Sequence, residues 1–438
     1  MKKLVALLLC LMMVVPATLA SAETAEGKVL NIWCWNDEFQ SRFNAYYPEV
    51  KEIAEDKSTT TLNDGTIVKW TINPNEGNNY QNKLDEALRA QESAAADDKI
   101  DIFLIEADYA LKYVDSPYTL DVKADIGLTD EDLGGQYKYT QEIATSADGK
   151  LKAVTWQATP GLFAYRRSIA KDVLGTDDPD AVQEALADWD KFNAVAEQAA
   201  AKGYYMLSGY DDAYRTFSNN VSAPWVADDG ETVVVDANLM KWVDQTKLYT
   251  DKGYNHKSSL WDATWAADQG PTGKVFGFFY STWGINFTLL GNSLATPTAE
   301  GGKEEVGNGI YGDYAVCEGP QPYYWGGTWI CGAAGSDNLE TIKDVMQKLT
   351  CDAAIAKKIT EDTQDYTNNV AAMNELAQNY SSAFLGGQNH IALFAEAAPK
   401  IDMSNISAYD QGLNESFQKA FKNYFDGNAT IDEAKQLF

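Results

Sequence analysis

The chain is poor in histidine, in cysteine and in basic residues. Only 2 of its 438 residues are His and 5 are Cys, which excludes the Cys/His clusters that typically bind zinc. Its 35 Lys and Arg face 64 Asp and Glu, and the resulting net charge of −29 repels nucleic acids and anionic membrane surfaces. Because hydrophobic residues make up 45% and aromatic residues 12% of the chain, we expect a folded protein rather than a disordered acidic one.

Long apolar runs are also absent, apart from a short one near residue 1. Residues 1–22 contain Lys2 and Lys3, an apolar run over 4–15 and small residues at 20–22, the pattern of an export signal cleaved near Ala22. This run is too short for a membrane span, so we expect an exported protein, either periplasmic or at the extracellular cell surface. Cys10 follows three leucines where a lipid-anchor signal has a small residue, so we predict that Cys10 leaves with the signal.

Four cysteines follow the signal, namely Cys34, Cys317, Cys331 and Cys351. An oxidising compartment permits a disulfide between Cys317 and Cys331, and buried free thiols are equally compatible with the sequence. We expect Cys34, inside a strand pattern, to be a buried thiol.

Strand and helix patterns alternate along the chain. Apolar strand patterns over 29–33, 67–72 and 100–105 enclose helical patterns over 37–47 and 79–96, and this β-α-β-α-β order predicts an α/β fold with a mostly parallel sheet. In such sheets ligands bind beyond the carboxyl ends of the strands. A second α/β segment begins after a Pro/Gly-containing bend at 157–161, with strands over 150–156 and 162–165, helices over 177–202 and 237–250, and a helical tail over 413–438.

Aromatic and hydrogen-bonding side chains recur together at the predicted strand ends. An indole can lie flat on the apolar face of a pyranose ring, and carboxylates and amides can hydrogen-bond its hydroxyls. A tryptophan near a strand end is often only core packing, but the pairing occurs four times, at 35–38, 106–109, 281–286 and 323–329. The predicted ligand-binding residues are Trp35, Asn36, Asp37, Glu38, Asp108, Tyr109, Trp156, Tyr214, Trp225, Trp283, Trp325 and Trp329.

Two other functions use the same residue types. A secreted glycosidase would use Glu38, Glu106 or Asp108 as catalytic carboxyl groups, and a cation- or polyamine-binding protein would use the acidic cleft without sugar. The sequence has no Gly-x-Ser-x-Gly motif, phosphate-binding glycine loop or metal-ligand spacing. We therefore expect a binding protein that is not an enzyme, with no catalytic residue, cofactor or metal.

Several motifs resemble the family 1 extracellular solute-binding proteins of bacterial carbohydrate ABC importers, the maltose-binding-protein-like group. These are Asp101-Ile102-Phe103-Leu104 with Asp108, the segment 149–167, Thr282-Trp283-Gly284 and the closing segment 424–438. The resemblance implies two lobes, each a mostly parallel sheet flanked by helices, which are joined by hinge crossovers and close on the ligand. It places further crossovers near 317–324 and 365–372.

The resemblance also implies how the chain divides and what it does. A first lobe would comprise 23–157 and 325–370, and a second lobe 158–324 and 371–438. A monomer would capture an oligosaccharide between the lobes and deliver it to the permease subunits of an ABC transporter. The first lobe would contribute Trp35 to Glu38, Asp108 and Tyr109, the second Trp156, Tyr214, Trp225 and Trp283, and the crossover strand Trp325 and Trp329.

Overall fold

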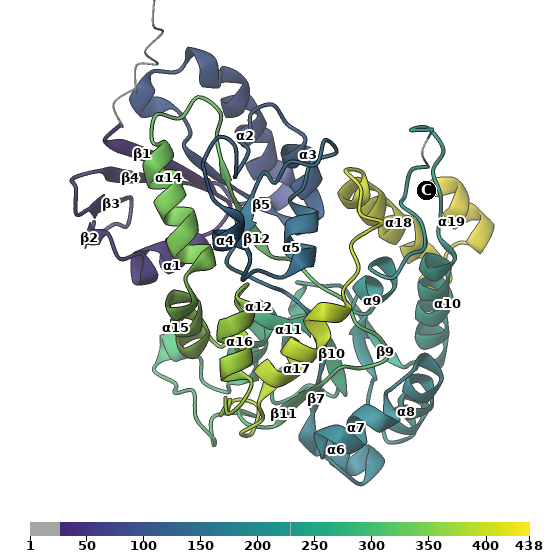
Figure 1. Ribbon diagram of the computed structural model, residues 1–438. Coiled ribbons are helices and arrows are strands. Elements are labelled where there is room, and N and C mark those ends of the chain that lie inside the picture. Colours follow the sequence, from purple (N-terminus) through teal and green to yellow (C-terminus); the bar gives the residue numbers. More distant parts are fainter. Residues whose placement is uncertain (1–26, 228) are drawn as a thin grey trace, which may run out of the picture.

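The computed structural model describes residues 27–227 and 229–438, and the predicted export signal with Cys10 lies outside these ranges. The chain forms two α/β lobes, one above the other in Figure 1. Within the described ranges, every helix is too short or too polar to traverse a lipid bilayer.

The upper lobe is built on a seven-stranded sheet of order β2-β3-β4-β1-β5-β12-β6. Helices α3 (Ala110–Val114), α5 (Lys138–Ile143) and α14 (Leu339–Met346) pack on it. Its strands are β1 (Val29–Cys34), β2 (Val50–Ile53), β3 (Thr59–Leu62), β4 (Ile67–Ile72), β5 (Ile102–Glu106), β6 (Val154–Thr155) and β12 (Thr328–Gly332).

The lower lobe contains a three-stranded sheet of order β10-β7-β11 and a two-stranded sheet of β8 and β9. The first of these sheets contacts helices α6 (Arg167–Leu174), α7 (Pro179–Ala185) and α17 (His390–Ala397). The second contacts α10 (Ala237–Lys252) and α11 (Ala263–Asp268). The strands are β7 (Gly161–Arg166), β8 (Leu207–Gly209), β9 (Asn255–Ser258), β10 (Gly277–Ser281) and β11 (Tyr314–Cys317).

The strand directions correct one expectation. The α/β fold with two lobes is as predicted, but among the strands in the described ranges only β4-β1-β5 and β8-β9 are parallel. The upper sheet is therefore mixed, and the three-stranded lower sheet is antiparallel, where mostly parallel sheets were expected. The short turns between β2, β3 and β4 make that edge antiparallel, since a tight turn can join only antiparallel strands. Strand β12 runs antiparallel to β5 and β6, and β10 and β11 run antiparallel to β7.

The helices begin and end at residues that suit these positions. Asp178 caps α7 just before Pro179, Thr430 begins α19 with a capping box, and Gly253 ends α10 in the left-handed conformation. Helices of the first half are α1 (Glu38–Tyr46), α2 (Asn79–Ala90), α3 (Ala110–Val114), α4 (Asp130–Leu133), α5 (Lys138–Ile143), α6 (Arg167–Leu174), α7 (Pro179–Ala185), α8 (Trp189–Ala201) and α9 (Tyr214–Ser218). Those of the second half are α10 (Ala237–Lys252), α11 (Ala263–Asp268), α12 (Thr282–Gly284), α13 (Gly291–Ser293), α14 (Leu339–Met346), α15 (Ala353–Thr363), α16 (Val370–Leu376), α17 (His390–Ala397), α18 (Asp410–Phe425) and α19 (Ile431–Leu437).

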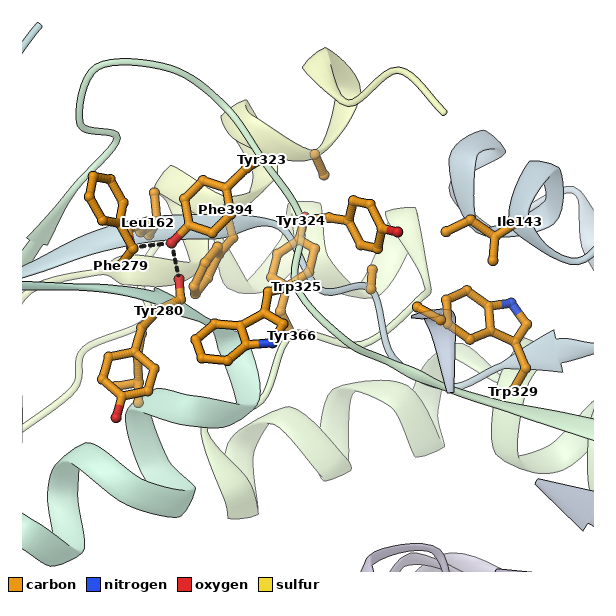
Figure 2. Packing of buried hydrophobic residues seen from close by; sticks show 14 of the residues in the cluster. Ile143, Leu162, Phe279, Tyr280, Tyr323, Tyr324, Trp325, Trp329, Tyr366 and Phe394 are labelled. Carbon is orange, nitrogen blue, oxygen red and sulfur yellow. Dashed lines mark hydrogen bonds between the residues drawn. The ribbon is translucent and has the colours of Figure 1, made fainter. Parts of the chain in front are cut away.

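Three chain segments, at 156–161, 323–325 and 366–368, run side by side between the lobes. Backbone N–H groups donate from Ala158 to Tyr366 (3.0 Å), Asn368 to Trp156 (2.8 Å), Gly161 to Tyr323 (2.7 Å) and Trp325 to Thr159 (3.1 Å). The Tyr323 hydroxyl also donates to the carbonyls of Leu162 and Tyr280, as Figure 2 shows. These bonds tie the three segments into one narrow connection.

All four described cysteines are free thiols. Cys317 lies in β11 of the lower lobe and Cys331 in β12 of the upper lobe, so the disulfide that the sequence permits does not form. Burial raises the pKa of Cys34 and of Cys317 to about 12, which makes both thiols unreactive at neutral pH.

Candidate ligand-binding site

A cavity of about 590 Å³ opens where β1, β5 and β12 of the upper lobe face the segment after β10 in the lower lobe. The apolar strands β1 and β5 end at this edge, and the polar residues that follow them turn into it. Predicted residues that line this cleft are Trp35, Asn36, Asp37, Glu38, Asp108, Trp283 and Trp325. The structure therefore brings four distant parts of the chain to one cavity.

Three predicted residues do not reach the cleft because they are core residues. Trp156 is 1% exposed and packs on Phe39, and Tyr109 is buried between Trp35 and Tyr113. Trp329 is also 1% exposed, and its indole N–H donates to the carbonyl of Thr140 in α5. Figure 2 shows it well apart from Trp325, beside Ile143.

Two further predicted residues lie in a neighbouring cavity of about 380 Å³ between α9 and α18. Tyr214 donates its hydroxyl to Asn414 of α18, and the Trp225 indole donates to the same side-chain oxygen at 3.1 Å. The two cavities share Asp108, Arg215 and Trp261, so the second is an extension of the cleft beyond these three residues.

An indole cluster, consisting of Trp261, Trp283 and Trp325, forms one wall of the cleft. Trp261 and Trp283 lie nearly parallel, with centroids 5.9 Å apart and planes at 15°, and Trp283 meets Trp325 edge-on at 5.2 Å. The Trp283 indole N–H donates to the Trp325 carbonyl at 3.0 Å, which fixes its orientation. On the other side, Trp35 is held edge-on by Tyr80 at 5.7 Å.

Trp261 is a site residue that the sequence analysis missed. Its side chain is 56% exposed at the cleft, and its backbone is left-handed with φ of 72°. A bulky residue in this conformation is strained, and such strain is concentrated at functional sites. Trp261 follows the end of β9 and precedes Asp262, so an indole is again paired with a carboxylate after a strand, but the polar sequence of β9 gave no strand pattern from which to find it.

Arg215, also missed, makes a bidentate ion pair with Asp108 across the cleft. The two guanidinium nitrogens lie 2.7 and 2.6 Å from the two carboxylate oxygens, and the guanidinium lies 5.5 Å from the centre of the Trp325 ring. Burial alone would raise the pKa of Asp108, but the charge and hydrogen bonds of Arg215 lower it below its ordinary value. Asp108 is therefore ionised, and each of its two oxygens accepts a hydrogen bond from Arg215.

The remaining carboxyl groups have few cationic partners. Glu38 accepts from Gln157 Nε2 at 2.8 Å, and the same nitrogen donates to Asp365 at 3.1 Å. Burial and the nearby Asp365 raise the pKa of Glu38 to about 7. Burial and Asp108 raise the pKa of Glu106 to about 8, so both carboxyl groups change charge near neutral pH.

The cleft thus combines flat apolar surfaces with carboxyl, amide and guanidinium groups. In the described ranges of the chain, no group of His, Cys, Asp or Glu side chains is arranged to hold a metal ion. Ring faces and hydrogen-bonding groups around one concave cavity suit a small polar molecule that has apolar faces of its own.

Comparison with known proteins adds two findings. A family model described as bacterial extracellular solute-binding protein matches residues 57–383, whereas no curated protein matches the chain significantly. The chain is similar to a solved structure described as an extracellular solute-binding protein of family 1, at 15% identity over 94% of this chain and 98% of that one, with a TM-score of 0.73.

Two further solved structures share the fold. One is the ABC transporter associated binding protein of Bifidobacterium animalis subsp. lactis in complex with β-1,6-galactobiose, at 16% identity over 93% of this chain and 94% of that one, TM-score 0.67. The other is the GacH receptor of Streptomyces glaucescens, described with acarbose, at 15% identity over 93% and 96%, TM-score 0.65. Because the matched family model spans most of the chain, the chain belongs to the bacterial extracellular solute-binding proteins.

Proposed function

We propose that this protein captures an oligosaccharide in the cleft between its lobes and delivers it to the permease of an ABC transporter, acting as a monomer without chemical turnover. The observation that carries the proposal is the cleft itself, where indoles of both lobes and carboxyl groups line one cavity of about 590 Å³. This volume lies within the range of about 300–1,000 Å³ that is usual for pockets holding small ligands. The sugar ligands named for two structural neighbours support it.

We assign residues 23–157 and 325–370 to the first lobe and 158–324 and 371–438 to the second. The three hydrogen-bonded segments between the sheets support this division, because they concentrate the connection in one narrow place. A hinge there lets the lobes close, and a ligand that contacts both lobes stabilises the closed state by its differential affinity.

In the proposed complex the sugar lies between Trp35 and the indole cluster. The indoles cover the apolar ring faces, while Asn36, Asp37 and Glu38 bind hydroxyl groups. The second cavity, lined by Tyr214 and Trp225, takes the end of a longer oligosaccharide.

A thermal-shift screen over a saccharide panel tests the proposal, with tryptophan fluorescence as the second readout. We expect at least one saccharide to raise the melting temperature of the wild type and not that of W283A. Trp70 on β4, whose indole donates to Thr60 and does not line the cleft, provides the matched control W70A. A saccharide that is hydrolysed during incubation, or a panel without any shift, would contradict the proposal.

A further inference from the structure

We infer that the saccharide bound in this cleft is an amino sugar, whose ammonium group lies beside the Glu106 carboxylate and whose ring lies on the indole cluster. This inference rests on the proposed function and adds the chemical class of the ligand. Three features support it: the balance of charges in the cleft, the surroundings of Glu106 and the shape of the indole cluster.

The cleft has more acidic groups than its cations can neutralise. Arg42 and Arg215 are the basic residues among its lining residues, and Arg215 is occupied by Asp108 through two short hydrogen bonds. Arg42 reaches only Glu38, at 4.0 Å. The lining acidic residues are Asp37, Glu38, Glu106, Asp108 and Asp365.

Glu106 has one oxygen engaged and the other directed at the indole cluster. Its Oε2 accepts the backbone N–H of Asp108 at 2.8 Å. A Cβ placed on Gly326 would lie 3.6 Å from Glu106 Oε1 and 3.0 Å from the Trp283 indole nitrogen. Glycine at this position, with φ of 72°, leaves open the space in which a ligand atom can approach both groups.

A carboxyl group in this position favours a cationic ligand. Its raised pKa shows that burial and Asp108 disfavour the charged form when no ligand is present. An ammonium ion would reverse this effect, because an opposite charge within a few ångströms stabilises the carboxylate. A neutral hydroxyl in the same place supplies no charge, so an amino sugar should bind more tightly than its hydroxyl counterpart.

The indole cluster favours an amine carried on a sugar ring over a flexible linear amine. Trp261 stacks on Trp283 with the two ring planes at 15°, and because the Trp261 side chain is 56% exposed, its outer face is open to the flat C–H face of a pyranose. Arg215 already lies over Trp325, so this cluster accommodates positive charge through cation–π attraction. The net charge of −29 would also attract a cationic solute to the protein.

Calorimetric titration with matched saccharide pairs tests the inference. Each pair differs only in an amine or a hydroxyl at carbon 2: glucosamine with glucose, galactosamine with galactose, and the β-1,4-linked di- and trisaccharides of glucosamine with those of glucose. At pH 6.5 the amines are charged, and Glu106, whose pKa is about 8 without a ligand, releases its proton to solvent when the ammonium group binds beside it. We expect the amine to bind at least about 10-fold more tightly than the hydroxyl in every pair that binds, since charge-assisted hydrogen bonds are about twice as strong as neutral ones.

The variant E106Q should remove this preference, so that the two members of a pair bind with similar affinity. Glu184, exposed on α7, provides the matched control E184Q, which should keep the preference. A second test uses the wild type alone. Added NaCl should weaken the binding of the amino sugar and leave the binding of its hydroxyl counterpart unchanged.

The outcomes separate this inference from the proposed function. Equal or tighter binding of the hydroxyl members, or a preference that survives in a folded E106Q, would overturn the inference and leave the proposed function standing. Binding of spermidine without any saccharide, or no binding by any member of the panel, would count against both.

Discussion

The ion pair between Asp108 and Arg215 should hold the lobes together even without a ligand. Asp108 follows β5 in the upper lobe, whereas Arg215 lies in α9 of the lower lobe. Their two hydrogen bonds of 2.7 and 2.6 Å therefore cross the cleft. We predict that R215Q shifts the ligand-free protein toward an open arrangement.

The expected size of this shift follows from the geometry and the solvent exposure of the ion pair. The side chains of Arg215 and Asp108 are 24% and 31% exposed, so the pair is shielded from solvent without being fully desolvated. Hydrogen bonds to charged groups contribute about 1.5–3 kcal/mol in general, and partial exposure reduces this to about 1–2 kcal/mol. The ratio of closed to open molecules should fall about 5- to 30-fold in R215Q.

Small-angle X-ray scattering of the ligand-free protein measures this shift as an increase in the radius of gyration. The control is D313N, which breaks the 2.9 Å pair between Asp313 and Arg166 next to β7 and β11, within a single lobe. D313N should lower the melting temperature and leave the scattering profile unchanged. Identical profiles for the wild type and R215Q would refute the reasoning.

Three other predictions concern single groups. The pKa of Glu106 is raised to about 8 in the folded protein, so the folded state holds this proton more tightly than the unfolded state. The stabilisation from this proton is lost as the pH rises from about 4.5 to about 8. Over this pH range the melting temperature of the ligand-free wild type should fall more than that of E106Q, and parallel curves would contradict the prediction. W261A should weaken saccharide binding by about 1–2 kcal/mol in calorimetry while changing the melting temperature of the ligand-free protein little, since this side chain is 56% exposed; unchanged affinity would remove Trp261 from the site. Thiol titration of the processed protein in denaturant should give four free thiols, whereas two would indicate the disulfide between Cys317 and Cys331.

The sequence predicted those parts of the site that follow a regular strand. Strands β1 and β5 are apolar runs, and the polar residues after them, from Trp35 to Glu38 and at Asp108, lie at the carboxyl ends of parallel neighbours as expected. Trp261 and Arg215 lie in a loop and a short helix whose positions depend on long-range packing. No apolar strand pattern directly precedes either residue.

Trp329 illustrates why part of the predicted set lies in the core and not at the cleft. Trp325 and Trp329 belong to one aromatic segment, but Trp325 precedes β12 and Trp329 lies within it, paired with Ile105 on one side and Thr155 on the other. A strand in the middle of a sheet that is covered on both faces buries its aromatic residues whichever way they point. The sequence shows the aromatic residues and not which of them leave the sheet.

The direction of β12 was also beyond local inference. Its residues are separated by more than 200 positions from β5, with which it pairs. A strand that returns from another lobe can enter a sheet in either direction, and the handedness rule for parallel crossovers does not apply to it. For this reason the mixed character of the upper sheet appears only in the structure.

A sugar held between Trp35 and the indole cluster is the central feature of the proposed function. A crystal structure of the protein with the saccharide that gives the largest thermal shift tests this claim most directly. We predict electron density for a pyranose ring in contact with Trp35 and Trp283, with its polar groups directed at Glu38 and Glu106. Density for the saccharide on an outer surface, with the cleft free of sugar at saturating concentration, would contradict it.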